Sequence, residues 1–433
     1  MSGLNDLLQA IETSARQGEE TVLATVVKVE GSAYRRPGAR MLIPLHGRTI
    51  GTVSGGCLEQ DLARKAWWLT DSGEPVVRRY STGATEDEDD DQSALTFGLG
   101  CNGTVFVMLE RLRAKTPSLA IELLRQVRDS LQPAAMATII ATSRHTSVRV
   151  GDRVSHASPA LRNRALDSSI RKDLRKTLTE KKTSLRLYTD ARGEVEVFFE
   201  YVAPPPRLVI FGAGHDAQPL VRMSKLLGWH VSVIDSRSHF ARPERFPQAD
   251  AVIVAHLDAS IVLGPLIEGA AVAVMTHSYR QDRHWLGQLL QGAPAYIGQL
   301  GPRERTERLL TDIRQHNPAL NALLQLHYPM GLDLGGDAPE SVALSILAEM
   351  TAALNLRNGG MLKHRCKPIH QVDLLVKSWR RQQRSIELFS DCELFSATLK
   401  KSLKPKWTTT QGNERCRTAS FSFGRPLPSV LCY

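Results

Sequence analysis

Residues 208–217 read LVIFGAGHDA, and this stretch decides how the second half of the chain folds. The apolar run 208–211 breaks at Gly212-Ala213-Gly214 and leads into residues 218–227, which have the pattern of a helix. Glycines let the backbone turn sharply and come close to a phosphate, and the N-terminus of the following helix offers free N–H groups. The stretch therefore predicts a strand, a tight turn and a helix.

A second strand with an acid at its end extends this unit. Residues 230–234 read HVSVI and lead into Asp235, about twenty residues after the glycine turn. In a dinucleotide-binding unit, an acid at this place accepts a hydrogen bond from a ribose hydroxyl. We therefore predict a Rossmann-like, doubly wound parallel sheet in which Gly212, Gly214 and Asp235 bind a nucleotide. A βα turn with glycines used only for packing is the alternative.

Further strands are expected over residues 251–256, 270–275 and 295–300, the first two with buried character. The carboxyl ends of such strands line the ligand site of a doubly wound sheet. His277 follows the strand 270–275 and is therefore a candidate ligand-facing residue. A histidine satisfied by backbone is the alternative, and the sequence shows no evident acid to pair with it.

The first half of the chain has its own glycine-rich turn, which contains a cysteine. A strand over residues 49–53 leads into Ser54-Gly55-Gly56-Cys57, and residues 58–70 read as a helix. A helix N-terminus stabilises a thiolate, so Cys57 is a candidate nucleophile or soft metal ligand. The backbone N–H groups of the same turn, at Gly55 and Gly56, are candidates to bind an anion. A small structural cysteine is the alternative.

Two neighbouring segments add candidate residues. The loop 30–40 carries Arg35, Arg36 and Arg40, whose guanidinium groups suit bidentate recognition of phosphate or carboxylate. A solvated loop is the alternative. Cys101 lies among the glycines of FGLGCNG, and two glycine-flanked cysteines in one domain would be able to share a pocket. The sequence does not place them together.

Two local signals mark boundaries in the chain. Pro204-Pro205-Pro206 is a stiff linker between domains. Asp337 with Glu340 predicts a capping box ahead of a helix over residues 341–354. The predicted domains are an α+β N-terminal domain over 1–203, a Rossmann-like domain over 207–365, and a basic, disordered tail over 366–433.

Composition narrows the class of protein. The net charge of +10 is concentrated after residue 360, where fourteen Lys and Arg stand against five Asp and Glu, so nucleic acid is not an expected partner of the body of the chain. No apolar run approaches the ~20 residues that span a bilayer, so we expect no membrane contact and a cytoplasmic location. The six cysteines show no paired CxxC spacing, which indicates reduced thiols.

With these motifs placed in order, residues 5–365 resemble the XdhC/CoxI family of xanthine dehydrogenase accessory proteins. Three positions depart from the pattern usual in that family, namely Asn102, Ser278 and Pro302. The motifs that carry the resemblance are ATVVKVEGSAYRRPGAR (24–40), GTVSGGCLE (51–59), FGLGCNG (97–103), FGAGH (211–215), MTH (275–277), YIGQLG (296–301) and GLDLGGDAPE (331–340).

The resemblance implies a chaperone that binds molybdenum cofactor (molybdopterin), supports its sulfuration and inserts it into an apo xanthine dehydrogenase-type molybdenum hydroxylase. It implies that hydroxylase as the partner and leaves open a cysteine desulfurase, a homodimer and a nucleotide in the Rossmann domain. An NAD(P)-dependent oxidoreductase is the alternative function. The expected cofactor-binding residues, with Cys57 also the metal ligand, are Arg35, Arg36, Arg40, Gly55, Gly56, Cys57, Cys101, Gly212, Gly214, His215, Asp235 and His277.

Overall fold

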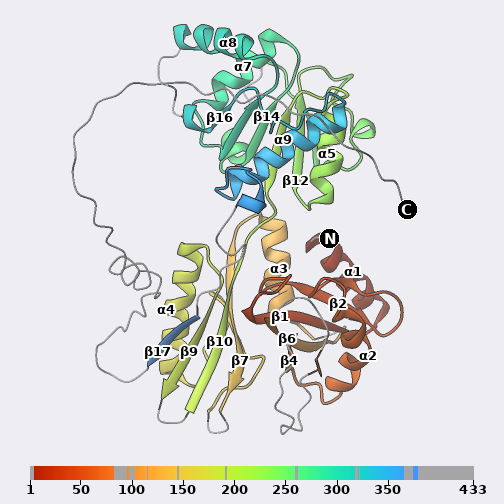
Figure 1. The fold of residues 1–433 in the computed structure, drawn as a ribbon, viewed down its shortest axis with the longest axis vertical. Helices are drawn as coiled ribbons and strands as arrows, with labels where there is room; N and C mark the ends of the chain where they lie inside the picture. Colours follow the sequence, from red (N-terminus) through yellow and green to blue (C-terminus); the bar gives the residue numbers. More distant parts are fainter. Residues whose placement is uncertain are drawn as a thin grey trace, which may run out of the picture. The chain divides into compact units, whose positions relative to one another are not determined.

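The computed structural model describes residues 4–81, 95–96, 103–114, 116–143, 146–190, 193–258, 262–316, 320, 322–364 and 374–378. Cys101, a predicted site residue, lies outside the described residues, as does most of the predicted tail. No helix in the described part of the chain is long and apolar enough to cross a membrane. Figure 1 shows how the helices and strands are arranged.

The second half of the chain contains a six-stranded sheet in which every neighbouring pair of strands is parallel. Its order is β13-β12-β11-β14-β15-β16, so the first strand, β11, lies in the middle and the order reverses beside it. This is the strand order of a Rossmann fold, and the prediction is confirmed. The strands are β11 (Arg207–Phe211), β12 (His230–Asp235), β13 (Ala251–Val254), β14 (Ala271–Val274), β15 (Tyr296–Gln299) and β16 (Leu326–His327).

Helices cover both faces of this sheet, as Figure 1 shows. Side chains alternate along β11: Leu208 and Ile210 join one buried cluster, and Val209 and Phe211 join another. The first cluster includes side chains of α5 and α9, the second side chains of α7 and α8. The helices here are α5 (Ala217–Leu226), α6 (Gly264–Ile267), α7 (Tyr279–Leu289), α8 (Arg303–His316) and α9 (Pro339–Leu354).

Two local expectations in this half are wrong. Strand β13 is not buried, because it is the edge strand of the sheet and Val254 is 41% exposed. Helix α9 has no capping box: its N-cap is Ala338, which makes no side-chain cap, and Pro339 occupies the first turn. Proline is well suited to that place because its missing N–H would lack a partner in the helix anyway.

Two further sheets are built mainly from the first half of the chain. One has the order β3-β2-β1-β6-β4-β5, and the other has the order β17-β9-β10-β7-β8. The strands of the first are β1 (Thr21–Gly31), β2 (Arg40–Pro44), β3 (Ile50–Gly51), β4 (Val76–Ser81), β5 (Leu95–Thr96) and β6 (Gly103–Leu112). Those of the second are β7 (Ala134–Thr142), β8 (Arg153–Val154), β9 (Ser184–Asp190), β10 (Gly193–Val202) and β17 (Leu374–Ser378). Residues 374–378, in the tail that was predicted to be disordered, add a strand to this second sheet by pairing with β9.

The two sheets share a small core. Val27 and Met108 of the first pack with Ile140, Leu185 and Phe198 of the second. Around this core, α2 covers the first sheet with one set of apolar side chains, α1 and α3 pack together against another part of the same sheet, and α4 packs on the second sheet. These helices are α1 (Leu4–Gln17), α2 (Glu59–Leu69), α3 (Leu119–Ser130) and α4 (Arg164–Glu180).

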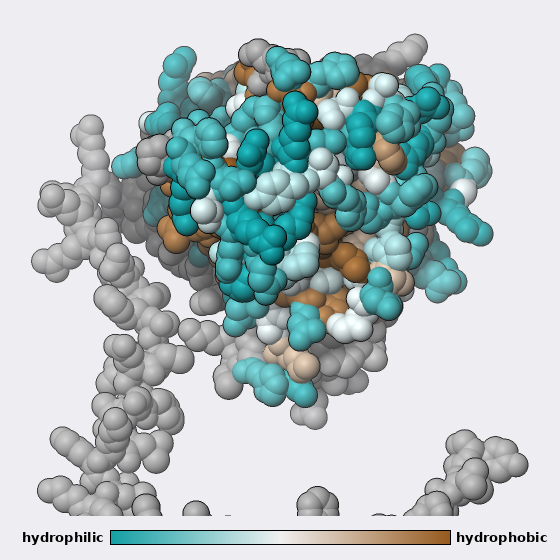
Figure 2. All heavy atoms as spheres, turned by 90° about the horizontal axis from the view of Figure 1, so that it is seen from above, coloured by the Kyte–Doolittle hydropathy of each residue, from teal (hydrophilic) through white to brown (hydrophobic). Residues whose placement is uncertain are grey.

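The surface is mostly hydrophilic, in contrast to the buried apolar clusters. Figure 2 presents one face, on which hydrophilic residues cover most of the area and hydrophobic residues reach the surface in smaller groups between them. The first half is thus an α+β unit and the second a doubly wound unit, each with its own buried apolar clusters.

Candidate functional site

The glycine turn after β11 lies where the strand order reverses. Gly212 has a φ of +121°, and a Cβ atom there would lie 2.4 Å from the carbonyl oxygen of Met275. Only glycine fits so close to the end of β14. The turn 212–214 and the segment 275–277 therefore meet at the carboxyl edge of the sheet, where α/β proteins bind ligands.

Asp235 ends β12 and is fully buried, but its neighbours already use its oxygens. Oδ2 accepts from the backbone N of Ala213 at 2.8 Å and from Nη2 of Arg237 at 2.9 Å. Oδ1 accepts from the backbone N and from Nε of Arg237, both at 2.9 Å. Burial opposes ionisation, yet these hydrogen bonds outweigh it and keep the pKa of Asp235 below its ordinary value. Asp235 thus fixes the glycine turn from within the protein.

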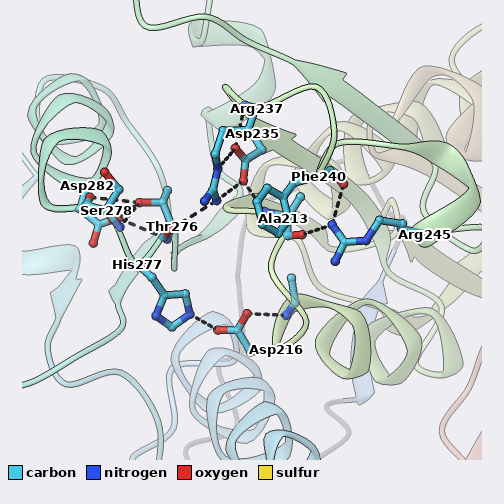
Figure 3. A network of polar contacts seen from close by, with 11 residues as sticks. Ala213, Asp216, Asp235, Arg237, Phe240, Arg245, Thr276, His277, Ser278 and Asp282 are labelled. Atoms are coloured by element: carbon cyan, nitrogen blue, oxygen red, sulfur yellow. Dashed lines mark hydrogen bonds and ion pairs between the residues drawn. The ribbon is translucent and has the colours of Figure 1, made fainter.

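Two arginines surround the same turn, as Figure 3 shows. The guanidinium of Arg237 lies 4.1 Å from the centroid of the Phe240 ring, and that of Arg245 lies 5.1 Å from it. Nη1 of Arg245 donates to the carbonyl oxygen of Ala213 at 2.8 Å. Ala213 is therefore held at its N–H by Asp235 and at its carbonyl by Arg245.

His277 has an acid partner, which corrects the expectation from the sequence. Its Nε2 lies 2.7 Å from Oδ2 of Asp216, the residue that caps α5. His277 has a φ of +59°, a left-handed conformation that is strained for residues other than glycine, and its side chain is 65% exposed. An exposed histidine with a carboxylate partner can transfer protons. His215, next to Asp216, is also exposed.

A buried network holds the segment that carries His277. Oγ1 of Thr276 donates to Asp282 of α7, which is 1% exposed. Asp282 also accepts from Nε2 of Gln299 at 3.1 Å and pairs with Nη1 of Arg305 at 2.6 Å. The strained backbone at His277 is therefore anchored on one side by residues of three different elements (Figure 3 shows the Thr276–Asp282 contact).

The cysteine turn in the first half is organised by an acid that was not among the predicted site residues, Glu59. Its Oε1 accepts from the backbone N of Val53 at 3.1 Å, from the backbone N of Ser54 at 2.8 Å and from the hydroxyl of Thr52. Burial raises the pKa of Glu59, but the hydrogen bonds from Ser54 and Thr52 outweigh this and lower it. A glutamate in the first turn of a helix is a signal that the sequence does contain.

The N–H groups before α2 are also occupied from within the turn. The hydroxyl oxygen of Ser54 accepts from the backbone N of Gly56 and of Cys57, both at 3.2 Å, and from that of Leu58 at 3.1 Å. An anion at these amides would have to replace Ser54. Cys57 itself is half-buried and not in a disulfide. The turn therefore holds its own hydrogen bonds and leaves the cysteine beside the helix N-terminus.

The structure brings two N-terminal motifs, and the last residue of a third, to one end of the first sheet. A Cβ atom at Gly55 would lie 3.6 Å from the ring of Tyr34, so the arginine loop packs on the cysteine turn. A Cβ atom at Gly103, which ends the second cysteine motif, would lie 2.1 Å from the carbonyl oxygen of Ser32. Gly103 also pairs with Gly31. Gly103 and the motifs 30–40 and 51–59 thus adjoin, while residues 97–102, which include Cys101, lie outside the described residues.

Of the three arginines, Arg40 has a structural partner. Its Nη2 lies 2.6 Å from Oε2 of Glu200, and the two side chains are 10% and 6% exposed. This ion pair joins β2 to β10, so phosphate binding by Arg40 would require it to break. Arg35 lies over the ring of Tyr34, at 5.7 Å from its centroid, beside the cysteine turn. Arg36 lies in the same loop. In the described part of the chain, no group of three or more His, Cys, Asp and Glu side chains forms a metal site.

Comparison with known proteins identifies the family. A model of the XdhC Rossmann domain matches residues 208–350, and a model of the XdhC and CoxI family matches residues 14–81. A protein of Bacillus subtilis (strain 168), described as a probable subunit of xanthine dehydrogenase, is 31% identical over 332 residues, which are 77% of this chain and 92% of that protein. The chain belongs to the XdhC and CoxI family.

Other similar proteins agree with this membership of the XdhC and CoxI family. The molybdenum cofactor insertion chaperone PaoD of Escherichia coli (strain K12) is 24% identical over 339 residues, 77% of this chain and 84% of PaoD. A crystal structure of a xanthine dehydrogenase from Bacillus halodurans has a TM-score of 0.59 at 29% identity, covering 81% of this chain and 96% of that one. The model of the XdhC and CoxI family spans the cysteine turn, and the model of the XdhC Rossmann domain spans the Rossmann turn.

Proposed function

We propose that this chain binds molybdenum cofactor, supports its sulfuration and inserts it into an apo molybdenum hydroxylase of the xanthine dehydrogenase type. The relatives support the proposal by their descriptions, one as a probable component of xanthine dehydrogenase and one as a molybdenum cofactor insertion chaperone. Both match this chain over 77% of its length. The two family models span residues 14–81 and 208–350, which include the two glycine turns.

The observation that carries the proposal is the construction of the turn 52–59. Glu59 accepts from the backbone N–H groups of Val53 and Ser54, and Ser54 accepts from the three N–H groups of residues 56–58, so these side chains of the protein itself hold the turn in shape. Cys57 belongs to this pre-formed turn, which packs on the arginine loop through Gly55 and Tyr34, and a sulfur ligand suits molybdenum or sulfur chemistry. Pre-organisation lowers the entropic cost of binding a cofactor that must later be released.

The donor set near Cys57 fits the cofactor. The thiolate of Cys57 would bind molybdenum or carry sulfur, and the guanidinium groups of Arg35 and Arg36 would bind the phosphate of the pterin. When bound, the cofactor supplies the metal centre that the hydroxylase needs. A sulfur donor such as a cysteine desulfurase, the second cysteine Cys101 and a homodimer remain predictions.

The direct test is an insertion assay. Purified apo-hydroxylase is mixed anaerobically with released cofactor, with and without this chain, and hydroxylase activity is followed over time. The proposal expects this chain to raise the rate or the yield of active enzyme at substoichiometric cofactor. Equal activity in the two mixtures, with a bovine albumin control for protein stabilisation, would contradict it.

A second candidate function, an NAD(P)-dependent oxidoreductase, is favoured by one observation. The pair of His277 and Asp216 at the carboxyl edge supplies the acid–base group that the sequence did not reveal. Titration of the chain with NADH, followed by nucleotide fluorescence, separates the two functions. Saturable binding together with substrate turnover would support the oxidoreductase, and binding without turnover would leave a cofactor-handling role.

A further inference from the structure

The carboxyl end of β12 in the Rossmann sheet differs from a site that binds a free ribose. We propose that it binds a phosphate monoester in place of a ribose diol, and that Arg237 determines this specificity. The inference concerns the ligand class of the Rossmann half and holds for either candidate function.

Asp235 has no hydrogen-bonding capacity left for a ribose. A carboxylate has about four acceptor positions. Four donors fill them, three from Arg237 and one from Ala213, and the carboxylate is fully buried. A ribose diol would need at least one of these positions, so it would have to displace a charge-assisted hydrogen bond of comparable strength.

Arg237, in contrast, still has donors. A guanidinium carries five N–H groups, and those of Nε and Nη2 point to Asp235, with a longer contact of 3.5 Å to the carbonyl oxygen of Thr276. Within the described residues, Nη1 has no hydrogen-bond partner, and the side chain is 33% exposed. Asp235 and Phe240 hold the guanidinium in place, so little entropy is lost when it binds an anion.

The local charge also favours an anion. The charges of Asp235 and Arg237 offset each other, and Asp216 is in hydrogen-bond contact with His277. Arg245 forms no ion pair with any described residue, and its buried Nη2 has no hydrogen-bond partner among them. It therefore adds a positive charge next to Ala213. A dianionic phosphate fits this edge better than a neutral diol.

A phosphate monoester can come from two sources, the 2′-phosphate of a nucleotide or the phosphate of a pterin. Two matched pairs of probes distinguish them. The first pair is adenosine 2′,5′-bisphosphate and adenosine 5′-monophosphate. The second is a pterin that carries a phosphate monoester and the same pterin after phosphatase treatment. Calorimetric titration of the full chain with each probe gives the preference for the phosphate in each pair.

The wild-type chain should prefer the phosphorylated member of at least one pair by about tenfold or more. Arg237→Gln should abolish that preference. Arg242→Gln, which removes an exposed arginine of the same loop, should retain it. Equal binding within both pairs by the wild-type chain, or no binding of any probe, would overturn the proposal without any variant. A preference that survives Arg237→Gln would also overturn it, and the insertion assay reports separately on the proposed function.

Discussion

The two strand–turn–helix segments β3–α2 and β11–α5 differ in how their glycine turns are held in shape. Each has a glycine-rich turn, and each turn is held by a carboxylate of the protein itself, Glu59 in the first and Asp235 in the second. Glu59 and Ser54 accept hydrogen bonds from the backbone N–H groups of residues 53, 54 and 56–58 around Cys57. Asp235 fixes one amide, while exposed donors of Arg237 and His277 remain at the edge.

The difference indicates a division of tasks. In the cysteine turn, side chains of the protein occupy the N–H groups of residues 53, 54 and 56–58, and the candidate reactive group is the half-buried sulfur of Cys57. A turn bordered by two arginines and a histidine has its exposed chemistry in cationic and acid–base groups. Glycine turns that look alike in sequence therefore present different side-chain chemistry, depending on where the nearest acid lies.

Loss of Asp235, the acid that holds the Rossmann turn, should cause the largest fall in the free energy of unfolding. Asp235→Ala removes four hydrogen bonds of a buried carboxylate and leaves Arg237 without its partner. We expect the free energy of unfolding to fall by about 3 kcal/mol, measured by urea denaturation. The exposed Asp337→Ala is the control and should change it by less than about 0.5 kcal/mol. A small effect of Asp235→Ala would mean that the acid does not hold the turn.

Loss of Glu59, the acid of the cysteine turn, should cause the second largest fall in the free energy of unfolding. Glu59→Ala leaves the N–H groups of Val53 and Ser54 without their acceptor, so we expect a loss of about 2 kcal/mol in the free energy of unfolding. Glu74→Ala, an exposed glutamate of the same half, is the control. If the two variants are equally stable, Glu59 does not organise the turn.

Lowering the pH should reduce the stability that Glu59 and Asp235 contribute to the two turns. The pKa values of Glu59 and Asp235 are lower in the folded chain than in the unfolded chain, so the unfolded chain binds more protons as pH falls. Their stabilisation is present above about pH 5 and is lost as pH falls through the folded pKa values. Glu59→Gln should make the loss of stability between pH 5 and pH 3 smaller than in the wild-type chain. An unchanged pH profile would contradict this assignment.

The smallest change in stability is expected from substitutions at His277, whose backbone is in the left-handed conformation. Glycine adopts that conformation without strain, whereas alanine does not. His277→Gly should therefore be more stable than His277→Ala by about 1 kcal/mol in thermal unfolding. Both variants lose the contact with Asp216, so the comparison isolates the backbone. Equal stability of the two would indicate that the backbone there is not strained.

Local sequence patterns predicted the Rossmann half because its strands, turn and helix adjoin in the chain. Contacts between distant residues could not be predicted in this way. Asp216 and His277 are 61 positions apart, and Arg40 and Glu200 are 160 apart. Their pairing depends on the fold, which brings the ends of separate strands together. Arg237, two residues after Asp235, was within reach of sequence reasoning, since an arginine so close to the acid competes for its oxygens.

The same distinction applies to the cysteine turn. The sequence placed Cys57 before a helix, and the helix begins at Glu59. The sequence did not reveal that the hydroxyl of Ser54 would accept from three consecutive N–H groups, because such a contact depends on the exact path of the turn. An anion at the N–H of Gly56 would therefore have to displace Ser54, and both an anion site at Gly55 and Gly56 and a sulfur site at Cys57 stay predictions.

The most direct test of a sulfur site at Cys57 is the molybdenum content of anaerobically purified protein. Molybdenum is measured by plasma mass spectrometry and pterin by fluorescence after oxidation, in the wild-type chain and in Cys57→Ala. We expect the molybdenum or its sulfuration to be lost in Cys57→Ala, with pterin reduced less because other residues bind its phosphate. Unchanged molybdenum, sulfuration and pterin in Cys57→Ala would contradict the account.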